Sequence, residues 1–461
     1  MSLDLKYPLP GTRALVAGAA RSGIAAARLL RRHGLAVTLC DRASEDSAAA
    51  AARRLAAEGV TCVWGRDDAG LLAGHDFVVW SPGLALDHPL AVAARAAGLP
   101  ILGELELGYR AARAPLLCIT GTNGKSTTTD LVGALLRAAG REVEVCGNIG
   151  RAICEVAESV SPAGLLVVEV SSFQLETVDR LHPHIATWLN LTPDHIDRHG
   201  SLATYSAMKQ RLFVHQTEDD WSVLNADDAE VISRRTGRAT PAEFSVAHAV
   251  DEGAFCEAGM LVLARRGGRE RLMPRSEVML PGPHNLANVL AALATVLPLE
   301  LGSNDVLRST LRAYAGLEHR LEPAGDVNGV RFVNDSKATN TDSLRVALQS
   351  FPEPVVLIAG GRDKGQDFRP LAVLVRTAVR QLVLIGEGAA AMAAAWPGVP
   401  HSRAATLADA VRQAYEAARP VGASVLLSPG CASFDMFRDY EDRGRRFKEE
   451  VARLATKGVT A

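Results

Sequence analysis

The chain has 461 residues, of which 48% are hydrophobic and 22% charged, values typical of a soluble protein with two or three α/β domains. Its formal net charge of -2 gives no general electrostatic basis for binding nucleic acid or a membrane surface. The apolar runs are too short to cross a bilayer, the first residues show no signal-peptide pattern, and the seven cysteines lack a CxxC pair. We therefore expect a cytoplasmic protein with reduced thiols and without nucleic-acid or membrane partners.

The first hundred residues predict an α/β domain. Residues 13–18 are typical of a short strand, residues 19–34 predict a turn and a helix, and residues 36–41 predict the next strand. Strand and helix signals continue beyond this unit, and we expect a break between Gly103 and Arg113. The sequence thus favours a Rossmann-like first domain at residues 1–103.

A glycine loop, GAARSG, follows the first predicted strand. It resembles a dinucleotide fingerprint only loosely, because Ala20 stands where a glycine normally admits a pyrophosphate. Asp41 and Arg42 end the second predicted strand, where their side chains could bind a ribose or a diphosphate. Three interpretations stay open: binding of NAD(P), binding of another nucleotide-linked ligand, and structural packing alone. We favour the second.

A second glycine loop, TGTNGKSTTT, predicts a phosphate site. It follows an apolar strand at residues 116–120 and precedes a helix that begins at Lys125. Backbone N–H groups and the dipole at such a helix start attract phosphate, Lys125 would reach the β and γ phosphates, and Ser126 would contact Mg²⁺. The general P-loop pattern needs a glycine where Ile119 stands, so this loop is a shortened variant. The alternative is a glycine turn with a helix cap. No motif that recognises a guanine base is evident, which favours ATP over GTP as the nucleotide.

Acidic and imidazole side chains follow the next strands. Glu169 ends an apolar strand, and the loop NLTPDHIDRHGS offers Asp194, His195 and Asp197. Carboxylates at the carboxyl ends of parallel strands face the ligand crevice of an α/β sheet. Together with Ser126 these groups suit Mg²⁺ carried by a nucleotide. Taken alone, His195 is more typical of a loop or capping residue.

Lysine is rare in this chain. Only seven of the 50 basic residues are lysines, and four of them are internal: Lys125, Lys209, Lys337 and Lys364. A lysine can lose its proton, which an arginine does not do in proteins. Lys209, on a predicted helix, could take up CO₂ as a carbamate and bind metal. The alternatives are chance survival of these lysines and an ordinary surface position for Lys209.

Strand and helix patterns continue to the end of a predicted central domain at residues 104–315, with β-hairpin character at residues 239–279. Near its end, Asn285 and Asn288 lie three positions apart on one helix face, where their amides could bind an adenine edge. A helix cap and a polar surface are the alternative interpretation.

A third α/β set at residues 316–461 begins with Arg320, which could close over phosphates. Three motifs, NDSKATNTDS, GGRDKGQDF and SPGCASFDMFRDYEDRG, each follow a predicted strand of this set. Because the carboxyl ends of parallel strands meet at one edge, we expect a site there for a small anion that carries carboxylates.

The ordered series TGTNGKST, GNIG, EVSSFQLE, DHIDRHGS, HNLANVLAA, HR, NDSKATN, GGRDKGQDF and SPGCASFDMF resembles the Mur ligases over nearly the whole chain. The resemblance implies three α/β domains: a Rossmann-like first domain, a central P-loop ATPase-type domain and a Rossmann-like C-terminal domain. It implies an ATP-dependent amide ligase that forms an acyl phosphate. Within the family, the C-terminal motifs favour the enzyme that adds D-glutamate to UDP-N-acetylmuramoyl-L-alanine, and we expect it to be a monomer.

The resemblance also implies residue roles. The uridine diphosphate end of the acceptor would be held by Ser22, Asp41, Arg42, Ser81 and Gly83, and its muramoyl part by Asn148. The ATP phosphates would be held by Gly121, Thr122, Asn123, Gly124, Lys125, Ser126 and Thr127, and the rest of the nucleotide by Asn285, Asn288, Arg320 and Asp335. Mg²⁺, at two sites, would be bound by Ser126, Glu169, His195 and a carbamylated Lys209. The implied catalytic residues are Lys125, Glu169, His195 and Lys209. Glutamate would be held by Lys337, Thr339, Lys364, Ser433, Phe434 and Tyr440.

Two other functions stay open. One is another amide ligase of the same architecture, such as a folylpolyglutamate synthetase or a different peptidoglycan ligase. The other is a non-catalytic ATP-binding or scaffold protein.

Overall fold

The structure, a computed structural model, describes residues 5–44, 53–280, 282–363 and 365–457. The chain divides into two compact units, which are described separately. The first unit runs to Met279 and includes His284–Tyr314, and the second comprises Leu280–Pro283 and the residues from Ala315. The described part of the chain contains no helix that is both long and apolar enough to span a membrane, and no disulfide joins its cysteines.

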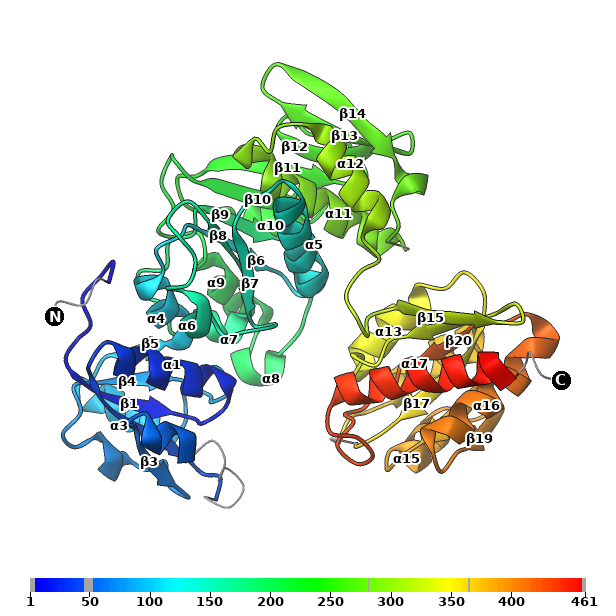
Figure 1. Ribbon diagram of the computed structural model, residues 1–461, viewed down its shortest axis with the longest axis horizontal. Coiled ribbons are helices and arrows are strands. Elements are labelled where there is room, and N and C mark those ends of the chain that lie inside the picture. Colours follow the sequence, from blue (N-terminus) through cyan, green and yellow to red (C-terminus); the bar gives the residue numbers. More distant parts are fainter. Residues whose placement is uncertain (1–4, 45–52, 281, 364, 458–461) are drawn as a thin grey trace. The chain divides into compact units, whose positions relative to one another are not determined.

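The first unit contains two sheets (Figure 1). The N-terminal sheet has five parallel strands in the order β3-β2-β1-β4-β5. Its strands are β1 (Arg13–Ala17), β2 (Ala36–Asp41), β3 (Thr61–Trp64), β4 (Phe77–Trp80) and β5 (Ile101–Gly103), and its helices are α1 (Arg21–Arg32), η1 (Ala69–Leu72) and α3 (Pro89–Ala96). Because β1 lies between β2 and β4, the loops after β1 and β4 meet, and Ser81 Oγ donates to Gly18 O at 3.3 Å. This is the crevice where open α/β sheets bind ligands.

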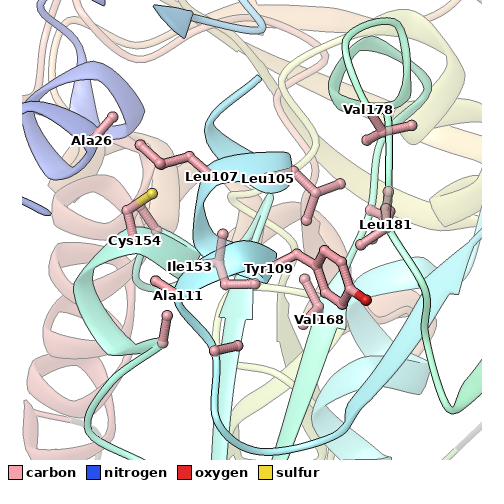
Figure 2. Packing of buried hydrophobic residues seen from close by; sticks show 14 of the residues in the cluster. Ala26, Leu105, Leu107, Tyr109, Ala111, Ile153, Cys154, Val168, Val178 and Leu181 are labelled. Carbon is pink, nitrogen blue, oxygen red and sulfur yellow. The ribbon is translucent and has the colours of Figure 1, made fainter. Parts of the chain in front are cut away.

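The segment between Gly103 and Arg113, where we expect a break, forms a helix, α4 (Glu104–Ala111), and all eight of its residues are buried. Figure 2 shows Leu105, Leu107 and Tyr109 of α4 among apolar side chains from other segments. Both acidic residues of this helix accept hydrogen bonds from segments far away in the chain, although Glu104 Oε2 has no partner among the described residues. Glu106 Oε2, for example, accepts three consecutive backbone N–H bonds of 2.9–3.1 Å, from residues 179–181.

The central sheet has nine strands in the order β14-β13-β12-β11-β10-β9-β6-β8-β7. They are β6 (Leu116–Thr120), β7 (Val143–Gly147), β8 (Leu165–Glu169), β9 (Ile185–Trp188), β10 (Trp221–Asn225), β11 (Thr240–Ser245), β12 (Gly253–Glu257), β13 (Met260–Arg265) and β14 (Gly268–Pro274). The strands from β7 to β12 in this order are parallel, and β13 and β14 add antiparallel pairs. The predicted hairpin character is therefore confirmed for residues 253–274, whereas β11, at the start of the predicted segment, pairs in parallel with both of its neighbours.

Helices of the central sheet are α5 (Lys125–Ala138), α6 (Ile153–Val156), α7 (Ser172–Leu175), α8 (Ile196–His199), α9 (Leu202–Gln210), α10 (Ala229–Ser233), α11 (Pro283–Val296) and α12 (Asn304–Ala313), with the short helices η2 (Arg275–Glu277) and η3 (Leu297–Leu299). The functional loops follow β6, β7, β8 and β9. Because β6 lies between β8 and β9, the loops after these three strands share one edge.

The second unit contains a six-stranded sheet in the order β15-β16-β20-β17-β18-β19, with only β15 antiparallel. The strands are β15 (Glu322–Val327), β16 (Val330–Asn334), β17 (Val355–Gly360), β18 (Val379–Ile385), β19 (His401–Arg403) and β20 (Val425–Leu427). Its helices are α13 (Thr341–Gln349), α14 (Ala372–Ala378), α15 (Ala389–Ala395), α16 (Leu407–Ala418) and α17 (Tyr440–Lys457), with η4 (Arg369–Leu371) and η5 (Arg419–Val421).

Alternate residues of β17 enter two different cores, so both faces of this sheet are covered (Figure 1). Because β20 lies between β16 and β17, the three C-terminal motifs follow adjacent parallel strands. The prediction that they share one sheet edge is confirmed.

Candidate active site

The loop between β6 and α5 has the shape of a phosphate cradle. Gly124 starts α5 with φ 82°, and a Cβ there would lie 2.2 Å from Asn288 Oδ1. Lys125 Nζ donates to the carbonyl oxygens of Gly121 at 3.0 Å and Thr122 at 2.8 Å. No side chain caps the start of α5, so the first backbone N–H groups of this helix can bind a ligand. This geometry favours anion binding over the simple capped turn.

Asn190 is a residue that the sequence reasoning missed. It follows β9, and its Oδ1 accepts the backbone N–H groups of Thr122 at 3.0 Å and Asn123 at 2.8 Å. Its Nδ2 donates to Asn123 O at 3.1 Å. Asn190 therefore fixes the first half of the phosphate loop. The sequence offered one signal for Asn190: it follows β9, the strand that neighbours β6, and a polar residue at that place lies close to the loop after β6.

Glu169 is a buried carboxylate at the end of β8, only 1% exposed. Its Oε1 accepts a bond of 2.7 Å from Asn148 Nδ2, whereas its buried Oε2 has no hydrogen-bond partner among the described residues. An unpartnered buried carboxylate oxygen is costly unless a cation or a donor binds it. The register pairs Glu169 with Ile119, next to the start of the phosphate loop.

Lys209 lies on α9 and is 1% exposed, so the surface-lysine alternative is wrong. Its Nζ donates to Gly121 O at 2.9 Å and lies 4.5 Å from the ring centroid of Tyr205. Burial, and secondarily the charge of Lys125, lower the pKa of Lys209 well below its ordinary value, while Asp194 opposes them. Burial therefore shifts Lys209 toward the neutral amine, the form that can react with CO₂.

His195 immediately precedes α8 and has φ 52°, a left-handed conformation that is uncommon for a residue with a side chain. Its side chain is 47% exposed, its Nε2 lies 3.4 Å from Asp194 Oδ2, and its ring lies 4.7 Å from that of Phe173. It occupies a capping position without making a side-chain capping bond. The side chain of Asp197 lies outside the described residues.

Within the described ranges, no group of three or more His, Cys, Asp or Glu side chains gathers as a metal cluster. Mg²⁺ at nucleotide sites, however, uses one or two carboxylates and completes its coordination with phosphates and waters. The unpartnered Glu169 Oε2 and the buried hydroxyl of Ser126 at the start of α5 fit this type of site.

The two asparagines of α11 lie beside the phosphate loop. Asn285 and Asn288 are each 6% exposed, and Asn288 Nδ2 donates to Asn285 Oδ1 at 3.0 Å. Thr128 Oγ1, in α5, contacts Asn288 Oδ1 at 3.5 Å. The polar-surface alternative for these residues is therefore wrong.

In the N-terminal sheet, Asp41 organises the first glycine loop. Its Oδ2 accepts Ala19 N–H at 2.6 Å and its Oδ1 accepts Ala43 N–H at 2.8 Å. Arg42 forms an ion pair with Asp67 at 2.7 Å and contacts His88 Nε2 at 2.9 Å. The remaining predicted residues surround this loop: Ser22 in the first turn of α1, and Ser81 and Gly83 after β4.

The three C-terminal loops are bound to one another. Gly430 N–H donates to Ala338 O, and Arg362 N–H donates to Ala432 O, both at 2.8 Å. Asp335, at the end of β16, accepts Ser428 Oγ at 2.8 Å. Burial raises the pKa of Asp335 to about 7, against the opposing effects of the Ser428 bond and the charge of Arg320.

The predicted glutamate-binding side chains lie along these loops. Lys337 Nζ is 5.9 Å from the ring centroid of Tyr440, Thr339 is half-buried, Ser433 is buried, and Phe434 is 58% exposed. Lys364 lies outside the described residues.

Arg443 is a second residue that the sequence reasoning missed. Its guanidinium, on α17, is fully buried and donates to Ser336 O at 2.8 Å, Ser336 Oγ at 2.9 Å and Cys431 O at 3.2 Å. Burial lowers its pKa to about 10. Arg443 therefore connects the loop after β16 to the loop after β20 through its hydrogen bonds to Ser336 and Cys431. Nothing in the sequence distinguishes it from the many surface arginines.

Three family models match the chain: "Mur ligase MurD-like, N-terminal domain" at residues 12–103, "Mur ligase middle domain" at 119–296 and "Mur ligase, glutamate ligase domain" at 319–431. A UDP-N-acetylmuramoylalanine–D-glutamate ligase from Pelotomaculum thermopropionicum is 43% identical over 96% of this chain and 98% of its own length. One of the same name from Myxococcus xanthus is 44% identical over 97% of this chain and 99% of its own length.

Among solved structures, the UDP-N-acetylmuramate–alanine ligase MurC from Thermotoga maritima shares the fold, with a TM-score of 0.59. It is 18% identical, and the match covers 96% of this chain and 99% of that one. Matched models over most of the sequence and relatives above 40% identity leave one assignment, and this chain belongs to the Mur ligase family.

Proposed function

We propose that the chain is an ATP-dependent ligase that adds D-glutamate to UDP-N-acetylmuramoyl-L-alanine, a cytoplasmic step of peptidoglycan precursor synthesis. The observation that carries this proposal is the 43–44% identity, over nearly the full length, to relatives with this reaction in their names. The alternative of a non-catalytic scaffold does not account for a buried amine and an unpartnered carboxylate oxygen near a phosphate loop.

We divide the binding of the three substrates among three domains, at residues 1–103, 104–315 and 316–461. The first binds the uridine diphosphate of the acceptor at the glycine loop that Asp41 organises. Its contacts are Ser22, Asp41, Arg42, Ser81 and Gly83, and Asn148 of the central domain holds the muramoyl part.

The central domain binds ATP at residues 121–127 and holds the rest of the nucleotide through Asn285 and Asn288, with Arg320 and Asp335 from the C-terminal domain. Lys125 exchanges its two carbonyl partners for phosphate oxygens, a stronger charge-assisted interaction. Ser126, Glu169 and His195 would hold Mg²⁺. When bound, the metal neutralises phosphate charge as the γ-phosphoryl group is transferred.

Lys209 completes the metal set as a carbamate. Its neutral amine adds CO₂, an N–C bond forms, and one proton is released to solvent, which leaves a negatively charged carboxylate-like group. The buried position supports this role, because desolvation disfavours the protonated form of the amine. An arginine at this position could not undergo this chemistry.

The reaction then proceeds in two displacements. A carboxylate oxygen of the alanyl group attacks the γ-phosphorus, ADP leaves, and an acyl phosphate forms. The unprotonated amine of glutamate attacks the acyl carbon, phosphate leaves, and the amide forms with loss of a proton. Positioning and charge neutralisation provide most of the rate enhancement. In the C-terminal domain, the carboxylates of glutamate are held by Lys337, Thr339, Lys364, Ser433, Phe434 and Tyr440.

Phosphate release by the purified protein tests the proposal. We expect release from ATP only when both UDP-N-acetylmuramoyl-L-alanine and D-glutamate are present, with L-glutamate as the matched control. Release that depends on a folate and not on the muramoyl nucleotide would assign the chain to folylpolyglutamate synthesis. ATP turnover that is independent of every acceptor would contradict ligase activity.

A further inference from the structure

One arginine of the N-terminal sheet's first helix holds a loop of the central sheet. Arg21 Nη1 donates to Gly150 O at 2.5 Å, and its Nη2 donates to Asn148 O at 3.1 Å, with a longer contact of 3.5 Å to Gly147 O. A positive charge in the first turn of a helix opposes the helix dipole, and α1 has no acidic residue there to offset it. An arginine at position 21 therefore does not stabilise α1. The hydrogen bonds that Arg21 makes to the loop after β7 explain its presence there.

The same loop holds Glu169 through both backbone and side chain. Asn148 N–H donates to Glu169 O at 2.9 Å, and Asn148 Nδ2 donates to Glu169 Oε1 at 2.7 Å. Gly147 is packed so closely that a Cβ there would lie 2.4 Å from Glu169 O. A shift of this loop would therefore move the only described hydrogen-bond partner of the carboxylate.

We propose that Arg21 is a positioning residue for Glu169. By holding the carbonyls of residues 147–150, it fixes the amide of Asn148, and Asn148 in turn directs the free oxygen of the carboxylate. This inference rests on the proposed metal-binding role of Glu169. Because Arg21 immediately precedes Ser22, the loop proposed to hold the acceptor is joined through Arg21 and Asn148 to the carboxylate proposed to hold the metal.

Arg32 provides a matched control, because it lies at the other end of α1 and also bonds to the central part of the first unit. Its Nη2 forms an ion pair with Glu158 at 3.1 Å and contacts Cys154 O at 3.4 Å. The described contacts of Arg32 include none with residues 147–150. Replacing Arg32 removes a comparable attachment of α1 and leaves the partners of Glu169 in place.

The test compares the full-length variants R21A, R21K, R32A and E169A. Mn²⁺ binding is measured by electron paramagnetic resonance in the presence of a non-hydrolysable ATP analogue, and kcat, KM and Tm are measured alongside. Loss of a residue that orients a metal ligand typically lowers metal affinity about 10- to 100-fold. We expect R21A to weaken Mn²⁺ binding about tenfold and to lower kcat, while R32A changes both less than about twofold. R21K retains the charge but lacks the planar fork, so its effect should be smaller than that of R21A.

Each pattern of results has a distinct meaning. If R21A and R32A lower Tm alike and R21A binds Mn²⁺ as tightly as the wild type, Arg21 only attaches α1 and the inference is wrong. If E169A loses Mn²⁺ binding while R21A retains it, Glu169 binds the metal and Arg21 does not position it. If E169A itself binds Mn²⁺ normally, the proposed role of Glu169 and this inference both fall.

Discussion

The central sheet and the C-terminal sheet both carry functional loops at the carboxyl edge of parallel strands, but they bury different groups there. In the central sheet, the buried amine of Lys209 donates to a carbonyl oxygen, and the buried carboxylate of Glu169 keeps one oxygen without a partner among the described residues. In the C-terminal sheet the buried groups, Asp335 and Arg443, are hydrogen-bonded, while Phe434 is exposed. The first arrangement suits chemistry on bound phosphate, and the second suits a rigid support for capturing a small substrate.

The largest expected effect tests the reactive lysine of the central sheet. Lys209→Ala removes the amine proposed to form the carbamate, and we expect turnover to fall at least about a thousandfold, because charge neutralisation dominates phosphoryl transfer. Short-chain carboxylic acids should restore part of the activity by occupying the vacated space as a carboxylate. Phosphate release measured against acid concentration provides the readout.

Lys125→Ala is the matched control for this rescue. It should also abolish turnover, through lost phosphate binding, yet no carboxylic acid should restore it, since the missing group is a cation. Absence of rescue of Lys209→Ala across a range of acids would count against the carbamate and would remove the contrast with the C-terminal sheet.

The next effect tests the structural arginine of the C-terminal sheet. Arg443→Met leaves three buried acceptors without their donor, so we expect a loss of about 2–4 kcal/mol in the free energy of unfolding of this unit. The loops should also lose their mutual position, which raises the KM for glutamate about tenfold with a smaller change in the KM for ATP. Denaturant melts and initial rates measure both quantities.

Arg446→Ala is the control for Arg443→Met, because Arg446 lies on the same helix but is half exposed and pairs with Asp442 at 3.1 Å. It should change stability by less than about 1 kcal/mol. An equal effect of the two variants on the KM for glutamate would show that Arg443 has no special connection to the loops.

The smallest effect on activity concerns α4, which packs between the two sheets of the first unit. Glu104 is fully buried, and burial raises its pKa to about 7 from an ordinary value of 4.5. The folded state therefore holds the proton more tightly than the unfolded state, and stability falls as pH rises from about 4.5 through about 7. Glu104→Gln removes this dependence, so its stability relative to the wild type should rise by up to about 3 kcal/mol across that window.

Thermal or urea melts at several pH values, with phosphate release at pH 8 as a check on activity, measure the Glu104 effect. Glu106→Gln is a useful comparison, because it weakens the acceptor for three backbone N–H groups and the Arg110 pair and should destabilise at every pH. Parallel stability curves for Glu104→Gln and the wild type would show that Glu104 does not carry the pH dependence.

The sequence predicted the elements that depend on local pattern. The strand, glycine loop and helix around Lys125 were visible because apolar strands, glycines and helix starts have local signatures. The meeting of the three C-terminal motifs also followed, since parallel strands present their carboxyl ends at one edge.

Features that depend on distant partners were not predictable. Arg443 and Ser336 are 107 positions apart, and Arg21 and Gly150 are 129 apart, so neither arginine differs locally from a surface residue. Helix α4 was missed for the same reason, because the N–H donors that satisfy Glu106 come from residues 179–181. The lowered pKa of Lys209 depends on burial that only the fold creates.

The most direct test of the account follows an oxygen atom. Acceptor labelled with ¹⁸O in the alanyl carboxylate is incubated with ATP and D-glutamate, and the released inorganic phosphate is examined by mass spectrometry. An acyl-phosphate mechanism predicts that one labelled oxygen passes to each phosphate released from fully labelled acceptor. Phosphate without label, released together with amide product, would contradict the proposed mechanism.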